Sequence, residues 1–232
     1  MPEKEFKLAV LQPSYIPWLG YFEQISAVDT FIFFDDVQYT VRDWRNRNYI
    51  KATPDKLLLT VPVHGSQTIL IKDVKIDSEQ QWAKKHLKAI KYNYAKAPHL
   101  KEIIELLEPI LNHNWTYLAE LNIGIIQAIN AYLDIKTKLL RSSQLNIAVE
   151  DKNDRLINIC KGFGATHYYT GKAAKEYMDV DLFQKNNIKV IFQDYTHPIY
   201  SQQNGDFIPF LSIIDLLCNC GKASLQILKG RN

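Results

Sequence analysis

The sequence predicts an α/β fold built on a mostly parallel, doubly wound sheet, with a β-hairpin insertion and a helical middle portion. Two apolar runs, at 6–12 and 30–36, enclose a stretch of helical period, which is the pattern of a βαβ unit. Strand and helix patterns alternate again in the C-terminal part, as in doubly wound sheets. Residues 78–134 have the spacing of successive helices. We expect one domain over 1–232, with this helical insert.

Local patterns predict the hairpin insertion and the helices that follow it. Three strand candidates are separated by turn residues, at 47–52, 56–63 and 68–77. Ser78, followed three residues later by Gln81, matches a capping box, so a helix is expected to begin at Ser78. Two more helices are expected at 98–112, where Pro109 would introduce a kink, and from about 114 to 132.

The C-terminal part has the same alternation of short strands and helices. Strands are expected at 138–143, 166–171 and 189–194, and helices at 151–164 and 181–186. A buried helix over 210–221, ended by Gly221, is expected to close the fold.

Composition excludes several classes of protein. Hydrophobic residues make up 47% of the chain and charged residues 23%, which is typical of a folded domain. A net charge of +3 does not favour a nucleic-acid partner. The 3 cysteines lack metal-type spacing, so we expect reduced thiols and no metal site. Neither a signal peptide nor a long apolar stretch is present, and we therefore expect a cytoplasmic protein without membrane insertion.

The first candidate binding loop follows the first predicted strand. In open α/β sheets ligands bind beyond the carboxyl ends of the strands, which directs attention to the loops 12–20, 35–47, 142–154 and 170–175. In the first loop, Gln12 and Tyr15 are the expected hydrogen-bonding groups, and Trp18 and Tyr21 are further binding candidates. Gly20 allows the backbone to approach a ligand where the helix starts. The alternative is a connection stiffened by proline, with Trp18 and Tyr21 packed in the core.

The other loops carry charged and polar candidates. Asp35 and Asp36 are adjacent and point to opposite faces, so they do not suit an acid/base dyad, but one of them can face a ligand. We take Asp36 and His197 as candidates for moving a proton, the alternative for His197 being a structural role. The remaining binding candidates are donors suited to phosphate or carboxylate, namely Arg45, Asn46, Arg47, Thr170 and Gly171. A solvated or salt-bridged turn is the alternative for the arginines.

Several of these motifs together resemble a known family. The stretches "QPSYIPWLGYF" (12–22), "FFDDVQY" (33–39), "WRNRNYI" (44–50), "LTVPV" (59–63), "GATHYYTG" (164–171) and "LSIIDLLCNCG" (211–221) look like the WbqC-like family. The resemblance implies a cytoplasmic step in bacterial surface-polysaccharide biosynthesis, in O-antigen, lipopolysaccharide or capsule pathways. Thr170 and Ala174 stand where the family pattern suggests a serine and a second glycine.

A second, looser similarity concerns the first strand, loop and helix, which are arranged like the opening of the HxGH nucleotidylyltransferases and pantothenate synthetase. Those enzymes bind ATP at that helix start. In this chain Trp18 and Tyr21 occupy the two histidine positions, so the imidazoles that would contact phosphate are missing.

These observations support an enzyme, either a transferase or an ATP-dependent amide ligase. Its small-molecule substrate would be a nucleotide-linked amino sugar, modified by N-acylation, with ATP as the candidate activating cofactor. The alternative is a non-catalytic ligand-binding or partner subunit of a polysaccharide assembly complex. RNA binding through the loop of arginines and Trp44 is a third hypothesis, which would require affinity to fall steeply with salt.

Overall fold

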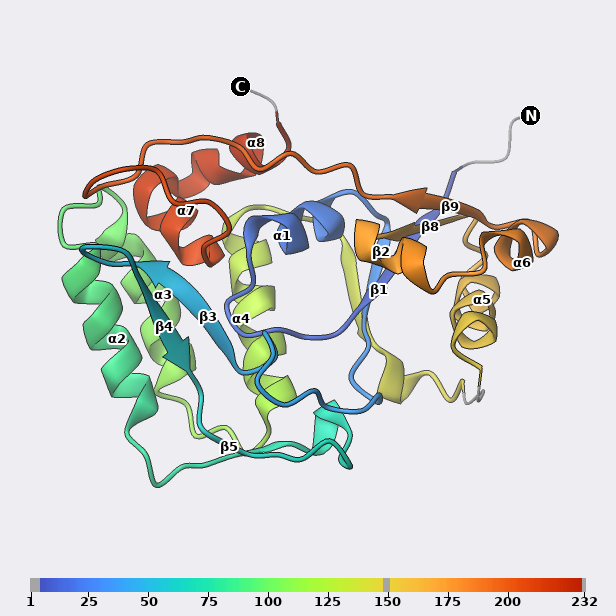
Figure 1. Ribbon diagram of the computed structural model, residues 1–232, viewed down its shortest axis with the longest axis horizontal. Helices are drawn as coiled ribbons and strands as arrows, with labels where there is room; N and C mark the ends of the chain where they lie inside the picture. The colour runs from blue at the N-terminus through green and yellow to red at the C-terminus, as the bar shows by residue number, and fades with distance from the viewer. Residues whose placement is uncertain (1–4, 148–150, 231–232) are drawn as a thin grey trace. The chain divides into compact units, whose positions relative to one another are not determined.

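A computed structural model describes residues 5–147 and 151–230. Residues 148–150 of the predicted loop 142–154 lie outside the described residues. The chain forms two compact units, each assembled from separate segments (Figure 1). Unit 1 consists of Met1–Gln12, Glu23–Phe34 and Lys136–Tyr195. Unit 2 consists of Pro13–Phe22, Asp35–Ile135 and Thr196–Asn232.

Unit 1 contains a five-stranded sheet in which every neighbouring pair is parallel. Its strands are β1 (Lys7–Leu11), β2 (Thr30–Phe33), β7 (Lys138–Arg141), β8 (His167–Thr170) and β9 (Lys189–Phe192). Their order is β7-β2-β1-β8-β9, so the winding reverses between β1 and β8. The mostly parallel, doubly wound sheet is confirmed.

Short helices connect the strands of unit 1. They are α5 (Lys152–Gly162) and α6 (Val180–Lys185), with 3₁₀ turns η2 (Ser142–Gln144) and η3 (Lys172–Glu176). Helix α1 (Leu19–Ser26) begins in unit 2 and ends in unit 1. Asp151 caps α5 by accepting from the backbone N–H groups of Asn153 and Asp154, at 2.8 and 2.9 Å. These free amides would otherwise lack a partner at the helix start.

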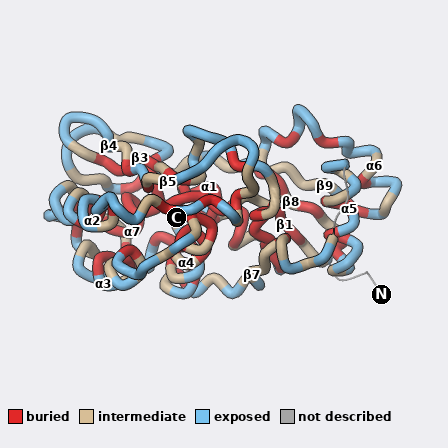
Figure 2. Tube along the Cα trace, turned by 90° about the horizontal axis from the view of Figure 1, so that it is seen from below, coloured by how far each residue is buried: buried red, intermediate tan, exposed pale blue. Residues whose placement is uncertain are grey.

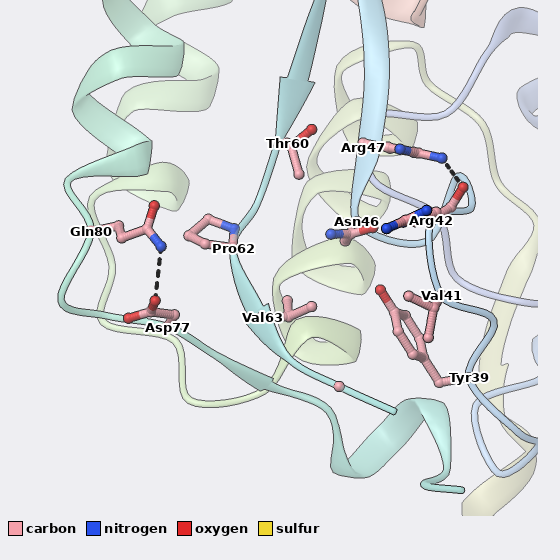
Figure 3. A pocket seen from close by; sticks show the side chains of 11 residues that line it. Tyr39, Val41, Arg42, Asn46, Arg47, Thr60, Pro62, Val63, Asp77 and Gln80 are labelled. Carbon is pink, nitrogen blue, oxygen red and sulfur yellow. Dashed lines mark hydrogen bonds between the residues drawn. The ribbon is translucent and has the colours of Figure 1, made fainter. Parts of the chain in front are cut away.

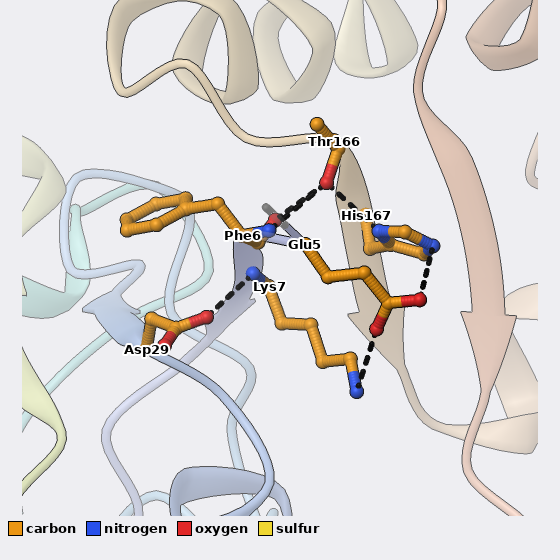
Figure 4. Close-up of polar contacts among 6 residues, drawn as sticks. All are labelled: Glu5, Phe6, Lys7, Asp29, Thr166 and His167. Atoms are coloured by element: carbon orange, nitrogen blue, oxygen red, sulfur yellow. Dashed lines mark hydrogen bonds and ion pairs between the residues drawn. The ribbon is translucent and has the colours of Figure 1, made fainter. Parts of the chain in front are cut away.

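Polar contacts hold the amino edge of this sheet together (Figure 4). The backbone N–H of Phe6 donates to Thr166 Oγ1 at 3.0 Å, and that of Lys7 donates to Asp29 Oδ2 at 2.8 Å. Thr166 Oγ1 also lies 2.9 Å from His167 Nδ1. These contacts lie at the amino ends of the strands, whereas ligands of open α/β sheets bind beyond the carboxyl ends.

Unit 2 contains the hairpin of β3 (Arg47–Lys51) and β4 (Lys56–Thr60), which confirms the hairpin insertion. A short pair follows, β5 (Val63–His64) with β6 (Lys75–Ile76). The prediction of one strand over 68–77 is wrong, because Ile71–Asp73 forms the 3₁₀ turn η1. The apolar spacing of this segment instead buries Ile71 and Val74 through that turn.

Helices make up most of unit 2, and the helical middle portion is confirmed. They are α2 (Trp82–Asn93), α3 (Leu100–Leu111), α4 (Leu118–Tyr132), α7 (Ile213–Cys220) and α8 (Ser224–Leu228), with the turn η4 (Gly221–Ala223). Much of α4 and α7 is buried, as the red segments of Figure 2 indicate. The predicted start at Ser78 is wrong: α2 begins at Trp82, and its N-cap Gln81 makes no side-chain capping bond.

Candidate functional site

A cavity of about 320 Å³ opens in unit 2 beside the β3–β4 hairpin. Figure 3 shows side chains reaching it from the loop before β3, from the end of β4 and from the segment before α2. The side chains that line it include those of Tyr39, Arg42, Asn46, Arg47, Thr60, Asp77 and Gln80. Its volume lies at the small end of the range for ligand pockets.

Two arginines supply the positive charge of this cavity. Arg47 is paired across the hairpin with Thr60, so the two side chains leave the same face of the sheet. Arg47 Nη2 donates to the carbonyl oxygen of Arg42, whose backbone has a left-handed φ of 61°. The Arg42 guanidinium has no hydrogen bond or ion pair within the part of the chain that the structure describes. Both side chains therefore retain donors suited to phosphate or carboxylate.

Asn46 contributes an acceptor to the cavity wall. This side chain is 8% exposed, and its Nδ2 donates to the carbonyl oxygen of Val61 at 2.9 Å. The bond fixes the orientation of the amide, and Asn46 Oδ1 is left buried without a hydrogen-bond partner among the described residues. An unpaired buried acceptor costs about 1–3 kcal/mol, so a donor that reached it would be bound favourably.

The far side of the cavity carries a carboxylate. Figure 3 shows Asp77 and Gln80 on the side opposite Arg42 and Arg47, with the Asp77 carboxylate turned toward the Gln80 amide. Asp77 accepts from Gln80 Nε2 at 2.9 Å and from the Glu79 backbone N–H at 3.1 Å, and its side chain is 18% exposed. Within the described residues its one ion-pair contact is with His64, at 4.0 Å. The cavity thus has positive charge on one side and negative charge on the other.

The predicted binding residue Arg45 holds two loops together. Its Nη1 donates to Ser14 Oγ at 2.7 Å, and its Nη2 lies 3.1 Å from Asp43 Oδ2. Burial lowers the pKa of Arg45, whereas the Asp43 charge raises it. Two buried asparagines outside the predicted binding set complete this link: Asn48 donates to the carbonyl oxygen of Ile16 and Asn122 to that of Arg45. Of the two predicted arginines, Arg45 and Arg47, it is Arg47 that lines the cavity.

Tyr15 and Tyr21 lie in the interior of unit 2. Tyr15 is 0% exposed, and its hydroxyl lies 2.8 Å from His86 Nδ1. Burial lowers the pKa of His86 to about 4, so its ring is neutral near pH 7 and accepts the tyrosine proton in a hydrogen bond. Tyr21 is 3% exposed. Both aromatic rings contribute to the hydrophobic core of this unit.

Packing explains the glycine at position 20. The Trp18 ring lies 5.8 Å from that of Phe210, measured between centroids. A Cβ atom on Gly20 would lie only 2.3 Å from the Trp18 ring. Gly20 is therefore required by the indole that lies against its backbone.

The candidates Gln12, Thr170 and Gly171 follow or end the strands on either side of the switch point, β1 and β8. A polar network that the sequence did not single out lies beside them. Gln24 donates to Gln193 Oε1 at 2.9 Å, and a Cβ on Gly171 would lie 3.3 Å from Gln24 Nε2.

The same network includes a partly buried carboxylate. Gln193 Nε2 donates to Glu23 Oε2, and the Tyr169 hydroxyl lies 3.1 Å from each oxygen of Glu23. Burial raises the pKa of Glu23, and these two donors oppose the rise. Polar residues on the last turns of α1 and at the end of β9 were the signal that could have identified this network.

The two proton-transfer candidates lie in unit 2 in different settings. His197 Nε2 accepts from the backbone N–H of Phe210 at 3.1 Å, and Nδ1 lies 2.8 Å from the Pro198 carbonyl oxygen. This pair of bonds requires the neutral tautomer protonated on Nδ1. Burial lowers the pKa of His197, which favours this neutral form. Asp36 is half-buried and follows Asp35, which is 0% exposed.

A buried carboxylate in α7 also escaped the sequence prediction. Asp215 is 0% exposed and accepts from the hydroxyls of Tyr94 and Tyr200 at 3.0 and 2.7 Å. Gln202 Nε2 donates to the same carboxylate at 2.8 Å, while its Oε1 accepts from Lys51 Nζ at 3.0 Å. An acidic residue inside the apolar run 211–218 was the available signal.

Two features are absent from residues 5–147 and 151–230. No three side chains of His, Cys, Asp or Glu are grouped so that they could hold a metal ion. None of the helices there has the length and apolar character needed to cross a membrane.

Together, these features define an α/β protein with a doubly wound parallel sheet and, in its second unit, a small cavity lined by arginine. The chain belongs to the WbqC-like protein family, whose model matches residues 12–227. It is also 42% identical over 227 residues to the uncharacterized protein Rv1507c of Mycobacterium tuberculosis, covering 96% of this chain and 97% of that protein. No solved structure matches this chain.

Proposed function

We propose that this protein acts in bacterial surface-polysaccharide biosynthesis by forming an amide on a nucleotide-linked amino sugar. The observation that carries this proposal is the cavity lined by Arg42 and Arg47, because guanidinium groups with open donors suit a phosphate-bearing substrate. Membership of the WbqC-like family supports it, since the family resemblance implies surface-polysaccharide pathways.

The proposed reaction joins the amine to an activated carboxylic acid. The ammonium group first loses a proton, and the neutral amine nitrogen attacks the carbonyl carbon. The bond from that carbon to the phosphate-bearing leaving group then breaks, and the nitrogen loses its second proton. ATP is the proposed activator of the acid. We propose that it binds near Gln12, Thr170 and Gly171, because nucleotides bind at the switch point of doubly wound sheets.

The proton from the amine needs an acceptor. We propose Asp36, because His197 could take a proton only at Nε2, which already accepts a bond from the Phe210 N–H. We therefore assign the transfer to Asp36 and a positioning role to His197.

The test is incubation of the purified protein with ATP, a mixture of carboxylic and amino acids, and a panel of nucleotide amino sugars, followed by mass spectrometry. We expect one amino sugar to gain an acyl group. Arg47→Gln should lower kcat/KM at least tenfold, because one phosphate contact is lost. Lys56→Gln is the matched control: it removes one positive charge from the same hairpin, outside the cavity lining, and should retain activity. The absence of both product and nucleotide binding would refute the proposal.

A second function, a ligand-binding subunit without turnover, is favoured by one observation. Both ring nitrogens of His197 already have hydrogen-bond partners, which suits a structural group better than a catalytic one. In that case Arg47→Ala would weaken nucleotide-sugar binding, and the protein would bind substrate without forming product. Binding by calorimetry beside the product assay separates the two functions.

A further inference from the structure

The cavity in unit 2 has two walls of opposite charge, and this arrangement limits what it can bind. Arg42 and Arg47 lie on one side, and Asp77 lies across from them (Figure 3). A ligand with an anionic group alone would leave the Asp77 carboxylate facing it without a compensating charge. A ligand that carries a positive group beside an anionic one would satisfy both walls.

The contacts of Asp77 leave room for such a positive group. Each of its oxygens accepts one bond, from Glu79 N–H or from Gln80 Nε2, and a carboxylate oxygen can accept more than one. Its contact with His64 is long, at 4.0 Å, and the His64 side chain is 72% exposed. An ammonium group would bind more strongly there than this solvated imidazole does.

Asn46 adds an independent constraint. Its Oδ1 is a buried acceptor that lacks a partner among the described residues, whereas its Nδ2 is held by the Val61 carbonyl oxygen. A hydroxyl or N–H donor of the ligand that reached this oxygen would therefore be bound favourably. The Thr60 hydroxyl, on the same face as Arg47, can bind either an oxyanion or a hydroxyl.

We infer that this cavity recognises an amino-sugar phosphate through its free ammonium group, with the phosphate on Arg42 and Arg47 and the ammonium on Asp77. The cavity of about 320 Å³ is small for a complete nucleotide sugar, so it would hold the hexosamine and the adjoining phosphate. This inference rests on the proposed function and specifies which part of the substrate the cavity selects. The site should discriminate against an N-acetylated sugar, which has lost the positive charge.

Calorimetry on the full-length protein tests the inference with three probes: glucosamine 1-phosphate, N-acetylglucosamine 1-phosphate and inorganic phosphate. We expect glucosamine 1-phosphate to bind at least tenfold more tightly than its N-acetylated form. Asp77→Asn should reduce that preference to less than twofold, because the amide keeps the acceptor for Glu79 N–H but removes the charge. This variant should bind inorganic phosphate at least as tightly as the wild type, because a repulsive charge is removed, and that binding also shows that it is folded.

The controls distinguish the contribution of Asp77 from that of the arginines. They also distinguish this inference from the proposed function. Glu79→Gln removes a neighbouring acidic charge outside the cavity lining and should leave the preference intact, whereas Arg47→Gln should weaken all three probes. Equal binding of the amine and its N-acetylated form, or a preference that persists in Asp77→Asn, would overturn the inference. If nucleotide amino sugars are still converted in that event, the proposed function stands; a clear amine preference without any product would instead refute the catalytic proposal.

Discussion

At the scale of single residues, burial distinguishes side chains that look equivalent in the sequence. Arg45 and Arg47 are two positions apart, yet Arg45 bonds Ser14 and Asp43 while Arg47 lines the cavity. A strand places successive side chains on alternate faces, so the register of β3 fixes the direction of Arg47, whereas Arg45 lies in the loop before the strand. The spacing of the motif could not separate these roles.

His86 should make stability depend on pH. Its pKa is about 4 in the folded chain, against 6.5 for a free imidazole, so the unfolded chain binds the proton more readily. The free energy of unfolding should therefore be at its full value above pH 7 and fall as the pH drops from 6.5 towards 4, by up to about 3 kcal/mol. Urea titrations at several pH values measure this slope.

The neutral variant His86→Gln should flatten that profile, because its amide can still accept from the Tyr15 hydroxyl but does not titrate in this range. His64→Gln, at a side chain that is 72% exposed, should leave the profile as in the wild type. An unchanged slope in His86→Gln would show that another group is responsible.

At the scale of elements, side-chain caps explain why some predicted helix boundaries are right and others wrong. The capping-box pattern at Ser78 did not start a helix, since Asp77 accepts the amide of Glu79 and the side chain of Gln80 in a turn just before α2. Asp151, by contrast, forms two capping bonds. Both positions carry residues that favour caps, but of the two it is Asp151 that bonds the free amides of the helix that follows.

Asp151→Ala should destabilise the protein by about 1 kcal/mol, because two amides at the start of α5 lose their acceptor. Asp151→Asn keeps a capping oxygen and should recover most of the loss. The midpoints of chemical denaturation compare the three proteins. Equal destabilisation by both substitutions would indicate that charge rather than capping is the source of the effect.

At the scale of the whole molecule, the chain passes repeatedly between two units, so neither is a continuous segment. The last segment, Thr196–Asn232, supplies unit 2 with a buried network around Asp215 that joins β3, the end of α2 and α7. Burial raises the pKa of Asp215, and hydrogen bonds from Tyr200 and Tyr94 oppose that rise. Residues far apart in the sequence therefore share one carboxylate as their buried hydrogen-bond acceptor.

Asp215→Ala should lower the free energy of unfolding by about 3 kcal/mol or more, because two tyrosine hydroxyls and the Gln202 amide lose a buried acceptor. Asp206→Ala is the matched control: Lys51 bonds the backbone oxygen of that residue, which alanine retains. Its effect should stay within about 0.5 kcal/mol in urea unfolding. Similar stabilities for the two variants would mean that the network contributes little.

The sequence by itself determined the parallel sheet, the hairpin, the helical middle portion and the family, because hydrophobic period and turn residues are local signals. It also marked Asn46 and Arg47 as binding candidates, and both line the cavity. Only the tertiary structure placed Asp77 and Gln80 in the lining of the same cavity. It also showed that Tyr15 is buried in the core. The physical reason is that a cavity is formed by segments distant in the chain, and burial depends on how those segments pack.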